Sequence, residues 1–133
     1  MPRKLQQLAA PFALWLTLLG GFNSLAVAQP FADMAPETLA QKDRDALLIL
    51  DVRSESEYDR GHVPGAIHIP HNDLTQRLDE LNGWQQKPVV IYCETGGRAR
   101  NAATLLQARG FNQVFHLDGD MREWRKSGRE VAF

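Results

Sequence analysis

Four short segments rich in apolar residues lie between positions 47 and 117, and polar or turn-forming residues bound each of them. Runs of this length predict strands, and continuous apolar runs are typical of strands that are buried on both faces of a sheet. The predicted strands are 47–50, 66–69, 89–92 and 114–117.

Helical signals fill the segments around these strands. Ser54, with Glu57 three residues later, has the pattern of a capping box that begins a short helix. The predicted helices are 36–42, 54–61, 72–81 (capped by Asn72 or Asp73), 98–109 and 120–127. Strands that alternate with helices at this spacing predict an α/β fold, a single domain with a mostly parallel central sheet flanked by helices on both faces.

The first 28 residues have the pattern of a secretory signal peptide. Arg3 and Lys4 precede a mostly apolar stretch, and Ala26 and Ala28 form a small-residue cleavage site. An uncleaved membrane anchor is the alternative, but the stretch barely reaches the ~20 apolar residues that a spanning helix needs. We therefore expect a cleaved signal peptide at 1–28, an N-terminal segment with a short helix at 29–45, loose over 29–35, and the main domain at 46–133.

The composition argues against several classes of partner. The chain has 133 residues, with 15 Lys or Arg and 16 Asp or Glu, so its net charge is −1. No basic stripe suggests a nucleic acid, and no basic tail suggests a membrane surface after cleavage. The four histidines, at 62, 68, 71 and 116, lack metal-ligand spacing. We expect no metal, no cofactor and a monomer, since no long apolar surface or coiled-coil pattern is visible.

Cys93 is the single cysteine of the sequence. It stands between a predicted strand and a glycine-containing loop, and the next helical run begins at Arg98. Backbone N–H groups converge at a helix N-terminus, where the helix dipole is positive. This environment favours the thiolate, which is the reactive form of cysteine.

Two interpretations of this thiol follow from the sequence. A lone cysteine in an exported chain is typical of a reactive or intermolecularly paired thiol. The alternative is a buried, inert cysteine that packs as a small hydrophobic residue. The strand–loop–helix position favours the reactive thiol, because ligands of α/β folds bind at the carboxyl ends of the strands, where Asp51 and Arg53 are also expected.

Three blocks of this sequence resemble the rhodanese homology domain. They are 50–53 with 61–70, then 90–99 with the pattern Cys-x-x-Gly-x-Arg, then 117–119 with Trp124 and Gly128. The family often has two glycines before its last helix, and here Gly119 is followed by Asp120. Together with the predicted signal peptide, the blocks make the chain similar to small exported single-domain rhodaneses of Gram-negative bacteria, which implies a periplasmic location.

The resemblance implies a sulfurtransferase. The Cys93 thiolate would attack the outer sulfur of thiosulfate or of another sulfane-sulfur donor, and the persulfide formed would pass its sulfur to cyanide or a thiol. The residues themselves suggest that Asp51 and Arg53 form an ion pair, which either supports the loop from the neighbouring strand or only stabilises the fold. The substrate-binding loop, whose N–H groups can surround the sulfur, would consist of Glu94, Thr95, Gly96, Gly97 and Arg98.

The side chains of this loop leave alternatives open. Arg98 either binds the anionic substrate or caps loop carbonyls, and Thr95 offers either its hydroxyl or its backbone alone. Glu94 places a negative charge beside the nucleophile, which disfavours the thiolate and repels dianionic thiosulfate. His62 is expected to be a turn and packing residue rather than a general base, because no partner is identifiable.

Three other functions compete with the sulfurtransferase. A persulfide carrier or partner-binding module would use Cys93 or the fold without turnover. A phosphatase or arsenate reductase is disfavoured because four residues separate Cys93 from Arg98, and related phosphatases have one more. A redox sensor is disfavoured because no second cysteine can resolve a sulfenic acid.

Overall fold

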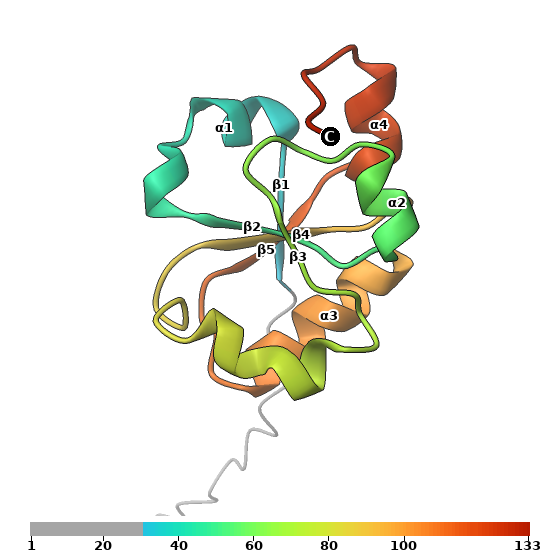
Figure 1. Cartoon of the computed structure of the whole chain (residues 1–133). Coiled ribbons are helices and arrows are strands. Elements are labelled where there is room, and N and C mark those ends of the chain that lie inside the picture. Colours follow the sequence, from blue (N-terminus) through green and yellow to red (C-terminus); the bar gives the residue numbers. More distant parts are fainter. Residues whose placement is uncertain (1–30) are drawn as a thin grey trace, which may run out of the picture.

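The computed structural model describes residues 31–133, which fold around a five-stranded sheet. The strand order is β1-β5-β4-β2-β3, and every neighbouring pair is parallel (Figure 1). The strands are β1 Ala32–Met34, β2 Leu48–Asp51, β3 Ile67–His68, β4 Val89–Tyr92 and β5 Val114–Leu117. The predicted α/β fold with a parallel sheet is therefore confirmed.

Helices cover both faces of this sheet. They are α1 Pro36–Gln41, α2 Glu55–Asp59, α3 Gly97–Ala108 and α4 Asp120–Lys126, with 3₁₀ helices η1 Arg44–Ala46 and η2 Leu74–Leu81. Side chains of α3 and η2 pack against one face, and side chains of α1 and α4 pack against the other. Among the helices of residues 31–133, none is both long and apolar enough to cross a membrane.

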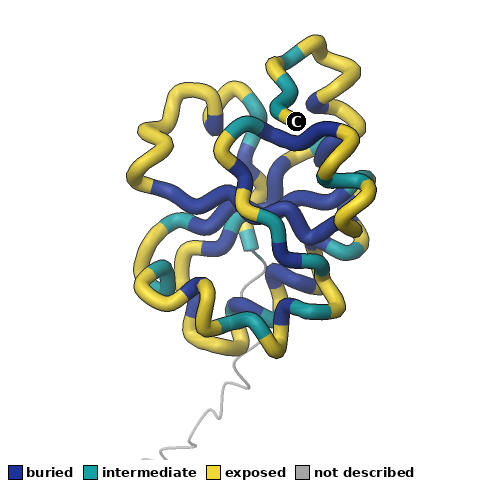
Figure 2. The backbone as a smooth tube through the Cα atoms, viewed as in Figure 1, coloured by how far each residue is buried: buried dark blue, intermediate teal, exposed yellow. Residues whose placement is uncertain are grey.

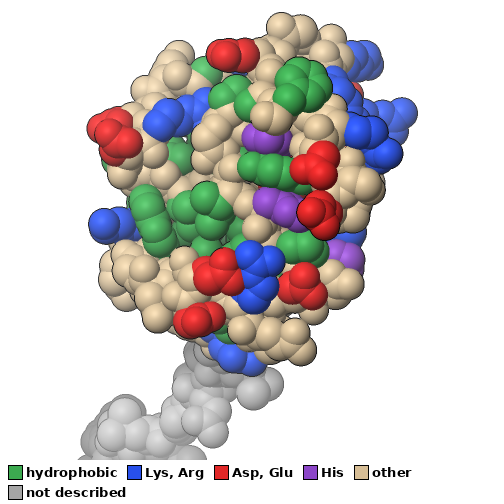
Figure 3. Space-filling view, in the orientation of Figure 1, with side chains coloured by type: hydrophobic (Ala, Val, Ile, Leu, Met, Phe, Trp, Pro, Cys, Tyr) green, Lys and Arg blue, Asp and Glu red, His purple; other side chains and the backbone are tan. Residues whose placement is uncertain are grey.

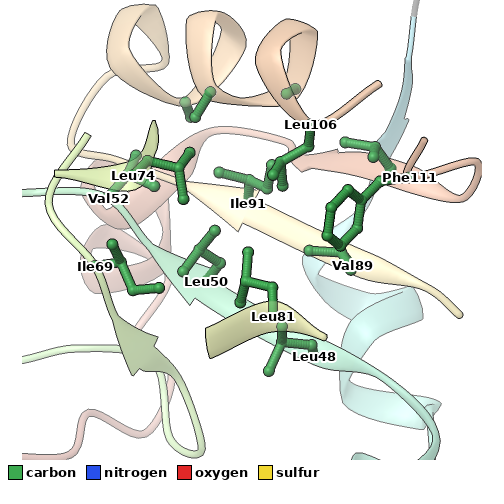
Figure 4. Packing of buried hydrophobic residues seen from close by; sticks show 14 of the residues in the cluster. Leu48, Leu50, Val52, Ile69, Leu74, Leu81, Val89, Ile91, Leu106 and Phe111 are labelled. Atoms are coloured by element: carbon green, nitrogen blue, oxygen red, sulfur yellow. The ribbon is translucent and has the colours of Figure 1, made fainter. Parts of the chain in front are cut away.

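The central strands alternate their side chains between two apolar clusters, as the period of two along a strand requires. Leu50 and Ile91 pack with Leu106 of α3 in the first cluster (Figure 4). Ile49 packs with Leu39 of α1 in the second. Burial on both sides explains the continuous apolar runs of the sequence, and the buried central strands are dark blue in Figure 2.

Two details of the predicted secondary structure are wrong. The segment expected to be loose contains β1, whose residues 32–34 pair with 115–117 of β5. Only Met34 of this edge strand is buried, so its apolar pattern is too weak to be recognised. The helix expected over 72–81 is the 3₁₀ helix η2, which is interrupted at Arg77 (φ −114°, ψ 18°) and has no side-chain cap from Asp73.

The predicted capping box at the start of α2 is confirmed. The Ser54 hydroxyl accepts the Glu57 N–H at 3.4 Å, and the Glu57 carboxylate accepts the Ser54 N–H at 3.0 Å. This local signal was read correctly from the sequence. The predicted signal peptide at 1–28 lies outside the described residues.

Candidate active site

The loop after β4 turns back toward Cys93. Gly96 has φ +114°, a left-handed conformation that glycine adopts more readily than other residues, and it directly precedes α3. As a result, the Gly96 N–H donates a hydrogen bond to Cys93 Sγ at 3.0 Å. The sulfur therefore receives a backbone N–H beside the N-terminus of a twelve-residue helix, where negative charge is stabilised.

Cys93 is only 1% exposed and belongs to the apolar cluster between the sheet and α3. This burial agrees with one part of the inert-cysteine alternative. The hydrogen bond from Gly96 favours the reactive interpretation, because such a bond stabilises negative charge on sulfur. A reaction partner must therefore be small, since a bulky group does not fit against a nearly covered residue.

A buried ion pair lies next to this loop. Arg53, 1% exposed, donates from Nη2 to Asp51 Oδ2 at 2.7 Å and from Nε to both carboxylate oxygens at 3.1 Å. The same guanidinium donates to the Gly61 carbonyl at 2.8 Å and to Glu94 Oε2 at 3.3 Å. Arg53 therefore joins β2, the turn at Gly61 and the residue that follows Cys93.

The Glu94 carboxylate is held between two guanidinium groups. Besides Arg53, it accepts a hydrogen bond from Arg125 of α4. This pairing offsets the negative charge that the sequence places beside the nucleophile. A cavity of about 440 Å³ opens here, lined by Arg53, Glu57, Arg60, Glu94 and Arg125. Three arginines face two glutamates in this cavity, and basic side chains also gather over the α4 side of the face shown in Figure 3.

Arg98 forms a two-pronged ion pair with Glu57 of α2. Its Nη1 and Nη2 atoms donate to the two carboxylate oxygens at 2.8 and 2.9 Å. The hydrogen bonds from Arg98 hold the pKa of Glu57 well below its usual range, and those to Glu57 raise the pKa of Arg98. Cys93 also raises the pKa of Arg98, to a smaller extent, so the guanidinium lies near the nucleophile as well. The ion pair with Glu57, which the sequence did not predict, ties α3 to α2 beside the loop.

The sequence pattern of the rhodanese-like domain matches residues 34–127. The chain belongs to this family. The fold agrees, because a thiosulfate sulfurtransferase from Pseudomonas aeruginosa superposes with a TM-score of 0.66 at 27% identity over 76% of this chain and 20% of that one.

Among curated relatives, a putative sulfur carrier protein YrkF of Bacillus subtilis is 36% identical over 79% of this chain and 57% of its own length. A tRNA uridine(34) hydroxylase of Escherichia coli is 31% identical over 72% of this chain and 29% of its own length. The chain thus spans about half or less of the length of these relatives.

The structure of this rhodanese-like domain brings most of the predicted site residues together. Cys93, Gly96 and Glu94 share the loop, and Arg53 with Asp51 contacts it from β2. Thr95 and Gly97 are exposed, and a Cβ at Gly97 would meet nothing within 4 Å. Residues 31–133 bring no group of three or more His, Cys, Asp or Glu into a metal-binding arrangement.

His62 lies in the turn before β3, as a packing residue would. Its ring stacks on Tyr58 at 3.8 Å between centroids, and Nδ1 is 3.0 Å from the Tyr58 carbonyl oxygen. His68 stacks on the same Tyr58 ring at 4.7 Å. Figure 3 shows histidine side chains on this face of the molecule with a hydrophobic side chain between them.

One contact of the nucleophile was missed by the sequence interpretation. The Cys93 N–H donates to Asp120 Oδ1 at 3.0 Å. The signal that could have identified it is the replacement of the second family glycine by Asp120, because that position lies at the start of α4 beside the carboxyl ends of β4 and β5.

Proposed function

We propose that this rhodanese-like domain is a thiosulfate sulfurtransferase that works through a persulfide on Cys93. The observation that carries the proposal is the 3.0 Å hydrogen bond from the Gly96 N–H to Cys93 Sγ, in a tight loop before α3. A sulfur in this position is prepared to carry negative charge, which both the attacking thiolate and the persulfide anion require.

The reaction proceeds in two balanced steps. The Cys93 thiolate forms a new S–S bond to the outer sulfur of thiosulfate, and the old S–S bond breaks with its electron pair leaving on sulfite. The persulfide anion then gives its outer sulfur to cyanide or to a thiolate. Cyanide becomes thiocyanate and Cys93 leaves as the thiolate, so the enzyme returns to its starting state.

The surroundings of Cys93 favour a small anionic donor. The 1% exposure of the residue suits a donor that presents one terminal sulfur atom. The adjacent cavity is lined by more arginines than glutamates, which favours the sulfite end of such a donor even though Arg53 and Arg125 pair with Glu94. The four-residue spacing from Cys93 to Arg98 supports sulfur transfer over phosphate chemistry, because the loops of related phosphatases are one residue longer.

A second candidate is a persulfide carrier that holds sulfur on Cys93 and delivers it only to a protein partner. The 36% identity to a protein named as a putative sulfur carrier favours it. So does Glu94, whose carboxylate occupies the arginines that would otherwise attract an anionic donor. Steady turnover with thiosulfate and cyanide supports the enzyme, and a single sulfur loading without turnover supports the carrier.

The location and the oligomeric state are part of the same proposal. We infer a periplasmic monomer, on the basis of the signal-peptide pattern at 1–28 and the absence of a long apolar surface pattern in the sequence. Cell fractionation of the full chain tests the first point, and recovery of a protein that has lost residues 1–28 supports it. Light scattering of the purified protein tests the second.

The decisive experiment is the intact mass of residues 29–133 before and after exposure to thiosulfate. A gain of about 32 Da, removed by cyanide, is the expected signature of one added sulfur atom. The Cys93→Ser variant serves as the control and should gain nothing. If the wild-type mass is unchanged while Cys93 still reacts with alkylating reagents, thiosulfate is not the donor.

A further inference from the structure

Asp120 has a backbone conformation that side chains normally avoid. With φ +54°, it is the one non-glycine residue of 31–133 in the left-handed region, where L-amino acids other than glycine pay a steric cost. It is also only 2% exposed. Strained residues of this kind persist where the surrounding structure holds them in place, and they often mark functional sites.

The contacts that hold Asp120 lie directly behind the Cys93 loop. Its Oδ1 atom accepts the Cys93 N–H at 3.0 Å, and its two oxygens lie 3.0 and 2.9 Å from His116 Nε2. A Cβ added to Gly96 would stand 3.0 Å from Asp120 Oδ2 and 3.5 Å from His116 Nε2. The carboxylate and the imidazole therefore support the same glycine whose N–H contacts the sulfur.

Both ring nitrogens of His116 face a carboxylate, an arrangement that suits the protonated imidazole. Its Nδ1 atom is 3.0 Å from Asp33 Oδ1 of β1, so each ring nitrogen faces a carboxylate. A neutral imidazole carries one N–H and can donate to only one of them. The hydrogen bond to Asp120 and, less strongly, that to Asp33 raise the pKa of His116, although burial and the nearby Arg100 of α3 oppose the rise.

We propose that Asp120 is a positioning residue for Cys93, which fixes the backbone at the start of the catalytic loop, and that His116 serves as its counter-cation. Without His116, the buried Asp120 carboxylate would place an uncompensated negative charge behind a sulfur that must itself become negative. With the imidazolium present, the hydrogen bond from the Cys93 N–H to Asp120 is retained, and the repulsion between the carboxylate and the thiolate is offset. The inference rests on the proposed function in one respect, namely that Cys93 reacts as a thiolate.

This arrangement has two separable consequences. The hydrogen bond from the Cys93 N–H to Asp120 requires only an acceptor oxygen on the side chain of residue 120, whether or not that side chain is charged. The balance of charge depends on the groups that face the imidazole, which are Asp33 from β1, Asp120 from α4, Arg100 from α3 and the Cys93 loop after β4. Some substitutions therefore alter the hydrogen bond without the charge balance, and others alter the charge balance without the hydrogen bond.

The first test measures the rate at which iodoacetamide, a small neutral reagent, alkylates Cys93 between pH 5 and 10. Because the chain has one cysteine, the rate reports on this thiol alone. His116→Gln retains a donor for Asp120 but lacks the cation, so its half-maximal pH should rise by about one unit. The double variant Asp120→Asn with His116→Gln removes both charges and should return the profile to that of the wild type.

The second test measures the rate of persulfide formation from thiosulfate. Asp120→Gly removes the acceptor but suits φ +54°, so the protein should fold normally and form the persulfide about 10-fold more slowly or worse. Asp120→Asn retains an acceptor oxygen and should stay within about 3-fold of the wild type. Asp118→Asn, an exposed change of the same charge two residues away, is the control and should alter neither rate.

The proposal is overturned if the alkylation profile of His116→Gln overlies that of the wild type, or if the double variant shifts equally. It is also overturned if Asp120→Gly, with an unchanged melting temperature, forms the persulfide at the wild-type rate. If even the wild type takes up no sulfur, the proposed function fails, and the alkylation profiles still decide the role of Asp120 and His116.

Discussion

Replacing Arg53 by Met removes a guanidinium while leaving an unbranched side chain of comparable length. Asp51, which is 0% exposed, would then retain one hydrogen bond within this pair, from the Arg53 backbone N–H at 2.9 Å. It would lose the three contacts from Nε and Nη2, and the Gly61 carbonyl would lose its bond from Nη2 as well. The variant therefore leaves a buried carboxylate without a cation.

The structure sets the size of the expected effect. Removing one partner of a buried, hydrogen-bonded ion pair costs about 3–5 kcal/mol, because the remaining charge stays out of water. In a domain of this size, each kcal/mol lowers the melting temperature by roughly 4–8 °C. We therefore expect Arg53→Met to lower the melting temperature by at least about 12 °C, and to reduce sulfur loading because Glu94 also loses a partner.

Urea unfolding of residues 29–133, followed by circular dichroism, measures this free energy. Arg77→Met is the matched control, since Arg77 pairs with Glu80 on the surface and its loss should change the midpoint little. The double variant Asp51→Asn with Arg53→Met should be less destabilised than Arg53→Met alone, because the stranded charge is gone. If Arg53→Met loses less than about 1 kcal/mol, the buried ion pair does not stabilise the domain as expected.

Three other variants test the loop and its neighbours. Gly96→Ala should destabilise the domain by about 1–2 kcal/mol in thermal unfolding and should reduce sulfur loading. The reason is that φ is +114° and that the new Cβ would lie 3.0 Å from Asp120 Oδ2. An unchanged melting temperature would contradict this prediction. Glu57→Gln should be less stable than the wild type at neutral pH. Arg98 lowers the folded-state pKa of Glu57, so the ion pair stabilises the domain above the usual value of 4.5, and this stabilisation is lost as the pH falls. The difference in stability between the wild type and Glu57→Gln should therefore shrink in acid. A difference that stays constant with pH would argue against the ion pair. Glu94→Gln should lower the KM for thiosulfate by about 3–10-fold, because it removes a negative charge from the cavity; an unchanged or higher KM would show that Glu94 does not oppose the donor.

Local patterns of the sequence predicted much of the fold. The buried strands β2, β4 and β5 were recognised to within one residue, because double-sided burial leaves an apolar run in the sequence. The capping box of Ser54 and Glu57 was recognised because both of its partners lie within four residues. The edge strand β1 was not predicted, because a three-residue strand with one buried side chain leaves almost no apolar pattern in the sequence. Its pairing partner β5 lies far away along the chain, so no local signal marks the pairing.

In the candidate site too, features that depend on neighbouring residues were predicted, and contacts between distant residues were not. Local patterns predict that Cys93 follows a buried strand, that a glycine-containing loop comes next and that a helix then begins, since these features depend on neighbours along the chain. The ion pair of Arg98 with Glu57, 41 residues away, and the hydrogen bond from the Cys93 N–H to Asp120, 27 residues away, become visible only in the folded chain. Such contacts depend on the order in which parallel strands assemble, and this order brings distant strand ends to one edge of the sheet without leaving a mark on the local sequence.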